Sequence, residues 1–101
     1  MDRATSEQFR LTLLGRRVSL LRHWRQARAE WQDDAAADTE ASLLDSIDAL
    51  GRRALARIQS SLVRIARGRY DECVACHADI DEQRLRVVPD TDRCGRCATE
   101  N

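Results

Sequence analysis

The sequence predicts a mainly α-helical protein, in which an antiparallel coiled-coil hairpin of two long helices is followed by a small module built around four cysteines. Two long segments carry apolar residues at steps of three and four, which is the spacing of one helix face. All four cysteines lie in the last third of the chain, in two Cys-x-x-Cys pairs. We therefore divide the 101 residues into a helical hairpin, residues 1–68, and a cysteine module, residues 69–101.

The first helix is expected over residues 6–32. Thr5 and Gln8 fit a capping box at its start, and Gly15 interrupts the pattern at a cost of roughly 1 kcal/mol that a long helix tolerates. Arginines fill the face opposite the apolar stripe. The stripe consists of Phe9, Leu13, Leu20, Trp24, Ala27 and Trp31, and it is widened by Leu14, Val18 and Leu21.

The second helix is expected over residues 40–67, with Asp38 or Thr39 as its N-cap and Gly68 as its C-cap. Between the helices lies "DDAAADTEAS", residues 33–42, which is too short for a domain linker. Two amphipathic helices joined by so short a turn must lie antiparallel, with this turn as the tip. The apolar stripe of the second helix consists of Leu44, Ile47, Leu50, Ala54, Ile58, Leu62 and Ile65.

The cysteine spacing is Cys73-x2-Cys76-x17-Cys94-x2-Cys97, which is typical of zinc sites. Each pair can present two thiolates to one ion from a tight turn, and two turns complete a tetrahedron. Four cysteine ligands leave no open position, so we expect one structural zinc ion per chain. Disulfides, a thioredoxin-like redox pair and an iron–sulfur site are the alternatives. A reducing compartment disfavours the first, and the missing βαβ pattern disfavours the second.

Two local features are expected inside the cysteine module. "RLRVVP", residues 84–89, predicts a short strand, followed by a turn in "PDTDR". His77 is expected in the left-handed backbone conformation after the first cysteine turn, because the four cysteines already complete the metal site.

Composition limits the function classes. Seventeen arginines balance seventeen acidic residues, which argues against a non-specific polyanion binder. No uncharged run approaches the ~18 residues of a membrane span, and the N-terminus has no apolar leader segment. A soluble cytoplasmic protein is expected, with no membrane partner.

Residues 68–97, "GRYDECVACHADIDEQRLRVVPDTDRCGRC", resemble the C4 zinc finger of the DksA/TraR family. The resemblance implies a transcription regulator that binds RNA polymerase, inserts its coiled coil into the secondary channel and alters promoter-complex stability through acidic tip residues. It implies a monomer that is not an enzyme, has no catalytic residues and does not bind specific DNA sequences. The chain ends four residues after Cys97, as in short members, so a ppGpp site that needs a further helix is not expected. The matching residues are Gly68, Tyr70, Ile80, Arg84, Leu85 and Pro89.

Two groups of charged residues are candidate contacts with a partner. Asp33, Asp34 and Asp38 lie at the tip, where acids near the end of the first helix oppose its dipole. Helix capping and turn solubility are their alternative roles. Arginines of the second helix are candidates for contact with an anion or polymerase, and a solvated face is the alternative. They are Arg52, Arg53 and Arg57, with Arg64 and Arg67 further along.

Two other functions remain open from the sequence. One is a zinc-stapled adaptor that binds another protein or a nucleic acid without a polymerase role, which would need a basic stripe with interleaved aromatic residues. The other is a redox-responsive enzyme, which would need an exposed thiol of low pKa that holds no metal.

Overall fold

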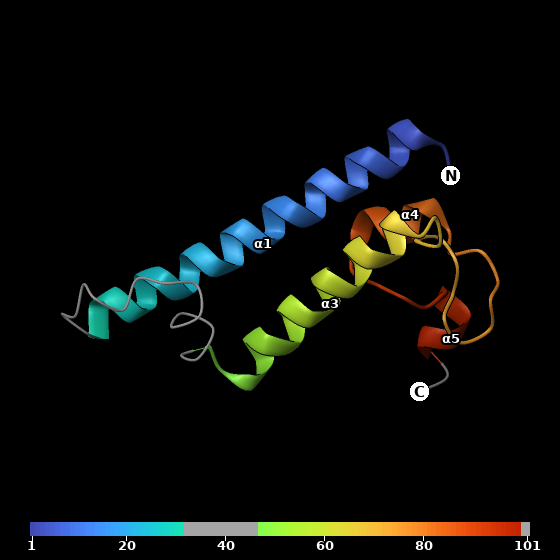
Figure 1. Ribbon diagram of the computed structural model, residues 1–101. Helices are drawn as coiled ribbons and strands as arrows, with labels where there is room; N and C mark the ends of the chain where they lie inside the picture. Colours follow the sequence, from blue (N-terminus) through green and yellow to red (C-terminus); the bar gives the residue numbers. More distant parts are fainter. Residues whose placement is uncertain (32–46, 100–101) are drawn as a thin grey trace.

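A computed structural model of the protein describes residues 1–31 and 47–99. Two long helices, α1 (Arg3–Trp31) and α3 (Ala49–Ala66), lie side by side and run in opposite directions (Figure 1). Two short helices follow, α4 (Glu82–Val87) and α5 (Gly95–Thr99). The mainly helical fold is confirmed, and the β pairing found in residues 1–31 and 47–99 is one isolated bridge between Glu72 and Asp79. None of the helices in these ranges is long and apolar enough to cross a membrane.

Helix α1 starts at an aspartate rather than at the predicted threonine. The backbone N–H of Thr5 donates to Oδ1 of Asp2 over 2.7 Å, and the N–H of Ser6 donates to the Asp2 carbonyl over 3.0 Å. Hydrogen bonds from the side chain and the backbone N–H of Thr5 lower the pKa of the Asp2 carboxyl. An aspartate caps the free N–H groups and complements the helix dipole at once, so the predicted Thr5 cap is wrong.

Helix α3 is shorter than predicted. Asp48 has an extended backbone (φ −72°, ψ 175°), and its carboxylate accepts from the N–H of Gly51 over 2.8 Å. This N-cap rules out an unbroken helix over residues 40–67. Residues 32–46 lie outside the described residues, and with them the predicted tip and its caps.

The other end of α3 confirms the predicted glycine C-cap. Gly68 has a positive φ of 70°, its N–H donates to Ile65 over 3.0 Å, and the N–H of Arg69 donates to Arg64 over 2.8 Å. Together these bonds form a Schellman motif, which requires the left-handed conformation that glycine adopts without strain. The chain therefore leaves α3 at a fixed angle and enters the cysteine module directly.

One hydrophobic core joins the base of the hairpin to the cysteine module. The Phe9 ring packs against the Tyr70 ring in a tilted arrangement, with centroids 5.2 Å apart and an interplanar angle of 47°. Partly buried Leu62 and Ile65 extend this core. Its buried members are Phe9, Leu13, Ile58, Tyr70, Cys73, Ile80 and Leu85.

Further along the hairpin, the predicted seam is only partly right. Leu50 is 73% exposed and Val18 is 50% exposed, so neither packs between the helices. Gly51 lies there instead, and a Cβ added to it would meet Ile47 and come within 2.9 Å of Nε1 of Trp24. The indole of Trp24 thus lies against Gly51, because glycine has no side chain that would occupy this space.

The strand predicted at residues 84–89 is wrong, since residues 82–87 form helix α4. Asp81 caps it by accepting from the N–H of Gln83 over 3.3 Å. Leu85 is fully buried while Val87 is 75% exposed. The cap followed by Glu82 and Gln83 is a helix-start signal that outweighs the β-branched valines.

Candidate metal centre

The structure brings all four cysteine side chains together at one end of the molecule. Their Sγ atoms lie within 4.8 Å of one another, and those of Cys76 and Cys94 are 3.7 Å apart. A tetrahedral zinc ion with Zn–S bonds of about 2.3 Å separates its sulfur ligands by about 3.8 Å. The arrangement of Cys73, Cys76, Cys94 and Cys97 therefore fits a closed site for one ion.

The first cysteine pair is shaped by a tight turn. The N–H of Cys73 donates to the Ala78 carbonyl over 2.8 Å, and the N–H of His77 donates to the Cys73 carbonyl over 2.9 Å. His77 has a φ of 65°, which confirms its predicted left-handed conformation. Its Nδ1 atom lies 3.2 Å from a carboxylate oxygen of Glu72, so the imidazole has a partner outside the sulfur cluster.

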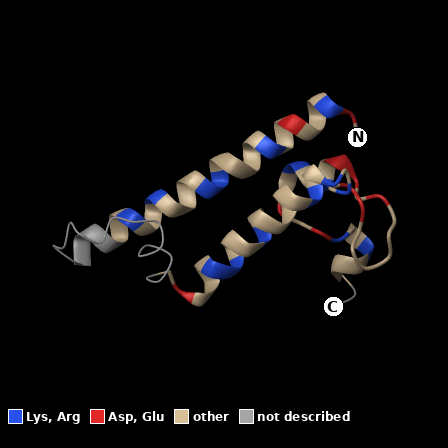
Figure 2. Cartoon of the chain, viewed as in Figure 1, with Lys and Arg blue, Asp and Glu red and all other residues tan. Residues whose placement is uncertain are grey.

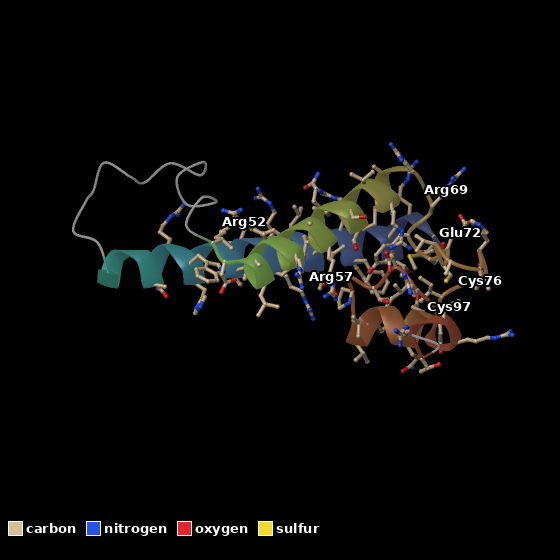
Figure 3. The ribbon with its side chains drawn as sticks, turned by 90° about the horizontal axis from the view of Figure 1, so that it is seen from below. Arg52, Arg57, Arg69, Glu72, Cys76 and Cys97 are labelled. Carbon is tan, nitrogen blue, oxygen red and sulfur yellow. The ribbon has the colours of Figure 1, made fainter. Side chains whose placement is uncertain are left out.

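The second cysteine pair opens helix α5. The N–H of Ala98 donates to the Cys94 carbonyl over 2.9 Å, which closes the first turn. The two pairs are also joined through the backbone, because the N–H of Val74 donates to the Asp92 carbonyl over 2.9 Å. Figure 3 shows Cys76 and Cys97 at the same end of the molecule, although they come from different turns.

The thiols of the cluster differ in acidity. The backbone N–H of Cys94, helped by those of Cys76 and Ala75, lowers the pKa of the Cys73 thiol to about 6. Contacts with the sulfurs of Cys76 and Cys94 raise the pKa of Cys97 to about 12. Four negative thiolates so close together repel one another, and a bound dication offsets that repulsion. The donor set and its spacing thus suit zinc.

Arg64 ties helix α3 to both halves of the cysteine module. Its guanidinium donates to the carbonyls of Tyr70 over 2.7 Å, Glu72 over 2.8 Å and Thr91 over 3.2 Å. It also lies 5.9 Å from the centre of the Tyr70 ring. Arg64 is therefore a structural residue that satisfies backbone carbonyls, and the solvated face given above as its alternative role is wrong.

Two more side chains hold the segment before the second cysteine pair. The buried hydroxyl of Tyr70 donates to the Pro89 carbonyl over 2.6 Å, and burial raises the pKa of Tyr70 to about 12. Nε of Arg84 donates to the Arg93 carbonyl over 2.9 Å. None of these bonds to backbone carbonyls has a sequence signature of its own, because any residue supplies a carbonyl.

The remaining candidate residues are placed apart from the cysteines. Arg57 forms a 3.0 Å ion pair with Asp90, while Arg52 and Arg53 are exposed on α3. Figure 3 shows Arg52 and Arg57 leaving α3 on different sides, so the structure does not gather these arginines at one place. The predicted tip acids, Asp33, Asp34 and Asp38, lie outside the described residues.

Sequence comparison identifies the cysteine module. Residues 68–101 match the family model of the prokaryotic dksA/traR C4-type zinc finger. An uncharacterized protein of Aquifex aeolicus (strain VF5) is 32% identical over 71 residues, which are 70% of this chain and 49% of the relative. The chain therefore spans about half the length of that curated relative.

Solved structures extend the likeness to the hairpin. The DnaK suppressor protein of Agrobacterium tumefaciens C58 is 30% identical with a TM-score of 0.72, covering 94% of this chain and 92% of that one. Transcription factor DksA2 of Pseudomonas aeruginosa is 25% identical with a TM-score of 0.77, covering 98% and 84%. The Dks protein of Chlamydia trachomatis L2, an RNA polymerase binding protein and transcriptional regulator, shares the fold at 14% identity, a TM-score of 0.68 and coverage of 99% and 90%.

The comparisons and the geometry agree about the cysteines. The family's finger has four cysteine ligands, and this chain presents four sulfurs at the spacing of one tetrahedral ion. The cofactor is accordingly one zinc ion. With the finger matched by the family model and 30% identity over 94% of this chain to a solved relative, the chain belongs to the DksA/TraR family of C4 zinc finger proteins.

Proposed function

We propose that this protein is a transcription regulator that binds RNA polymerase through the secondary channel and modulates promoter complexes with the tip of its hairpin. The observation that supports the proposal is the likeness to transcription factor DksA2, which is 25% identical with a TM-score of 0.77 over 98% of this chain, so that it includes the hairpin as well as the finger. The protein acts as a binding partner rather than as an enzyme.

The finger has a structural role in this proposal. Cys73, Cys76, Cys94 and Cys97 hold the zinc ion in a closed site that leaves no position for a substrate. Through the common core and Arg64, the finger fixes the base of the hairpin. A hairpin supported in this way can project its far end into a channel.

The tip supplies the regulatory charge. The segment of residues 32–46 holds five acidic residues and no basic one. Polymerase holds its catalytic magnesium with carboxylates, so further carboxylates nearby can perturb that cation or the mobile elements around it. We assign this role to Asp33, Asp34 and Asp38.

The test is a purified transcription assay with bacterial RNA polymerase, in which binding and open-complex lifetime are both measured. Asp34→Asn/Asp38→Asn removes two charges but keeps the side-chain size and the capping oxygen. We expect this variant to keep its free energy of unfolding within about 0.5 kcal/mol, to bind polymerase like the parent, and to lose most of its effect on open-complex lifetime.

The matched control is Asp79→Asn/Asp92→Asn, which removes two charges from exposed positions of the finger. It should regulate like the parent. If the tip variant also regulates like the parent, the tip acids have no regulatory role. If the parent does not bind polymerase at all, the proposed function is wrong.

A further inference from the structure

One side chain of α3 holds the backbone just ahead of both cysteine pairs. The Nη2 atom of Arg64 donates to the carbonyls of Tyr70 over 2.7 Å and Glu72 over 2.8 Å, and Nη1 donates to the carbonyl of Thr91 over 3.2 Å. Glu72 immediately precedes the first cysteine pair, and Thr91 lies three residues before the second pair. The guanidinium therefore links the two segments that carry the sulfur ligands.

The two segments need such a link, because the metal joins residues that are far apart in the chain. Cys76 and Cys94 are eighteen positions apart, yet their Sγ atoms lie 3.7 Å from each other. Four thiolates without a metal repel one another, so the sulfurs alone do not hold the segments together. The backbone bond from Val74 to Asp92 is one link, and the bonds of Arg64 are another. Links that hold a site in its bound conformation reduce the entropy cost of binding.

The guanidinium of Arg64 starts from a rigid part of the molecule. Arg64 lies in the last turn of α3, and its guanidinium is 5.9 Å from the centre of the Tyr70 ring. That ring packs against Phe9, and its hydroxyl donates to the Pro89 carbonyl over 2.6 Å. Because its own surroundings are fixed, Arg64 can position the loops that it bonds.

The charge of Arg64 also suits the loaded site. Zinc bound by four thiolates retains negative charge, because one dication does not balance four anions. Arg64 and Cys73 line the same cavity of about 260 Å³, so the guanidinium lies on the side of the first ligand. Figure 2 shows basic residues along α3 as far as the end that meets the finger. A cation in this place attracts the anionic metal site.

We infer that Arg64 is a positioning residue for the zinc ion: its bonds to the carbonyls ahead of both cysteine pairs preorganise the four sulfurs and set how tightly the chain holds the metal. It acts through the backbone and not as a ligand. Lysine cannot replace it, because an ammonium is a point charge, whereas the guanidinium donates in several directions from one rigid plane. The inference concerns the metal site alone, so it does not depend on the proposed function.

The experiment compares Arg64→Lys with Arg67→Lys in the full chain. Both substitutions keep the positive charge, and Arg67, at the end of α3, is exposed. Competition with a chelator measures the zinc Kd, and the ligand-field bands of the cobalt-substituted proteins report the geometry of the four sulfurs. We expect Arg64→Lys to raise the zinc Kd about tenfold or more and to change the cobalt bands. Arg67→Lys should stay within about twofold of the parent, with unchanged bands.

Ile58→Ala separates positioning from a general loss of stability, because it weakens the shared core and leaves the Arg64 side chain intact. Its cobalt bands should match those of the parent. A variant that unfolds without excess zinc is titrated with zinc while circular dichroism follows its folding, so that its Kd is still measured. Either a parental zinc Kd or parental cobalt bands in Arg64→Lys would overturn the inference, since a merely structural role lowers stability without moving the sulfurs.

Discussion

The two ends of the described hairpin are stabilised differently. At the finger end, α1 and α3 pack against a third layer, and Leu13 and Ile58 are 0% and 5% exposed. Further from the finger, the side chains of Trp24 and Ile47 both lie close to Gly51, where a Cβ would come within 2.9 Å of Nε1 of Trp24. The finger is thus not an appendage of the hairpin, because it supplies the remaining side of the hairpin's core.

Among the changes that test this difference between the two ends of the hairpin, loss of zinc should have the largest effect on stability. Structural zinc contributes ~10 kcal/mol or more of apparent binding free energy, whereas a chain of about 100 residues buries only about 60 to 65% of its unfolded surface, which leaves its stability marginal without the ion. We expect Cys73→Ser to abolish stoichiometric zinc and to unfold residues 69–97, with α1 and α3 still partly helical. Metal analysis and far-UV circular dichroism measure both results. A variant that melts as cooperatively as the parent would show that the finger does not support the hairpin.

Truncation of a core residue at the finger end should have the next largest effect. Ile58→Ala removes a side chain that is 5% exposed, and it should lower the free energy of unfolding by about 2 to 4 kcal/mol. Leu50→Ala, on the same helix but 73% exposed, should change it by less than about 0.5 kcal/mol. Denaturant titration compares the two variants, and equal losses would contradict the assignment of the seam.

The smallest effect is expected where the two helices meet away from the finger. Gly51→Ala places a Cβ 2.9 Å from Nε1 of Trp24 and against Ile47. Overpacking costs about 1 to 3 kcal/mol and the gain in helix propensity returns about 1, so we expect a modest net loss. Gly15→Ala is the matched control and should stabilise the free protein by about 0.5 to 1 kcal/mol, since open space surrounds that position. A stabilised Gly51→Ala variant would show that Trp24 can move away at no cost.

The sequence predicted those features that depend on spacing. Apolar periodicity gave both helices, the two Cys-x-x-Cys pairs gave the metal site, and Gly68 gave the end of α3. The prediction was wrong at residues 82–87, where two local signals compete. The Asp81 N-cap favours a helix and outweighs the valines, which favour a strand.

The features that the sequence could not predict depend on contacts between distant segments. The carbonyls that accept from Arg64 lie five to twenty-seven residues away, and nothing in the side chains of those residues marks them. Likewise, the packing of Gly51 beneath Trp24 depends on where the Asp48 cap starts helix α3. Both require the packed structure.

Phe9 and Ile58 share one core with Cys73, so zinc binding and the folding of the hairpin are thermodynamically coupled. By thermodynamic linkage, whatever free energy the bound ion adds to the folded hairpin, the folded hairpin adds to the binding of the ion. Phe9 in α1 makes no contact with the metal as a ligand, yet it helps to set the zinc dissociation constant. The available zinc concentration in turn sets the fraction of molecules in which α1 and α3 are held together at their base.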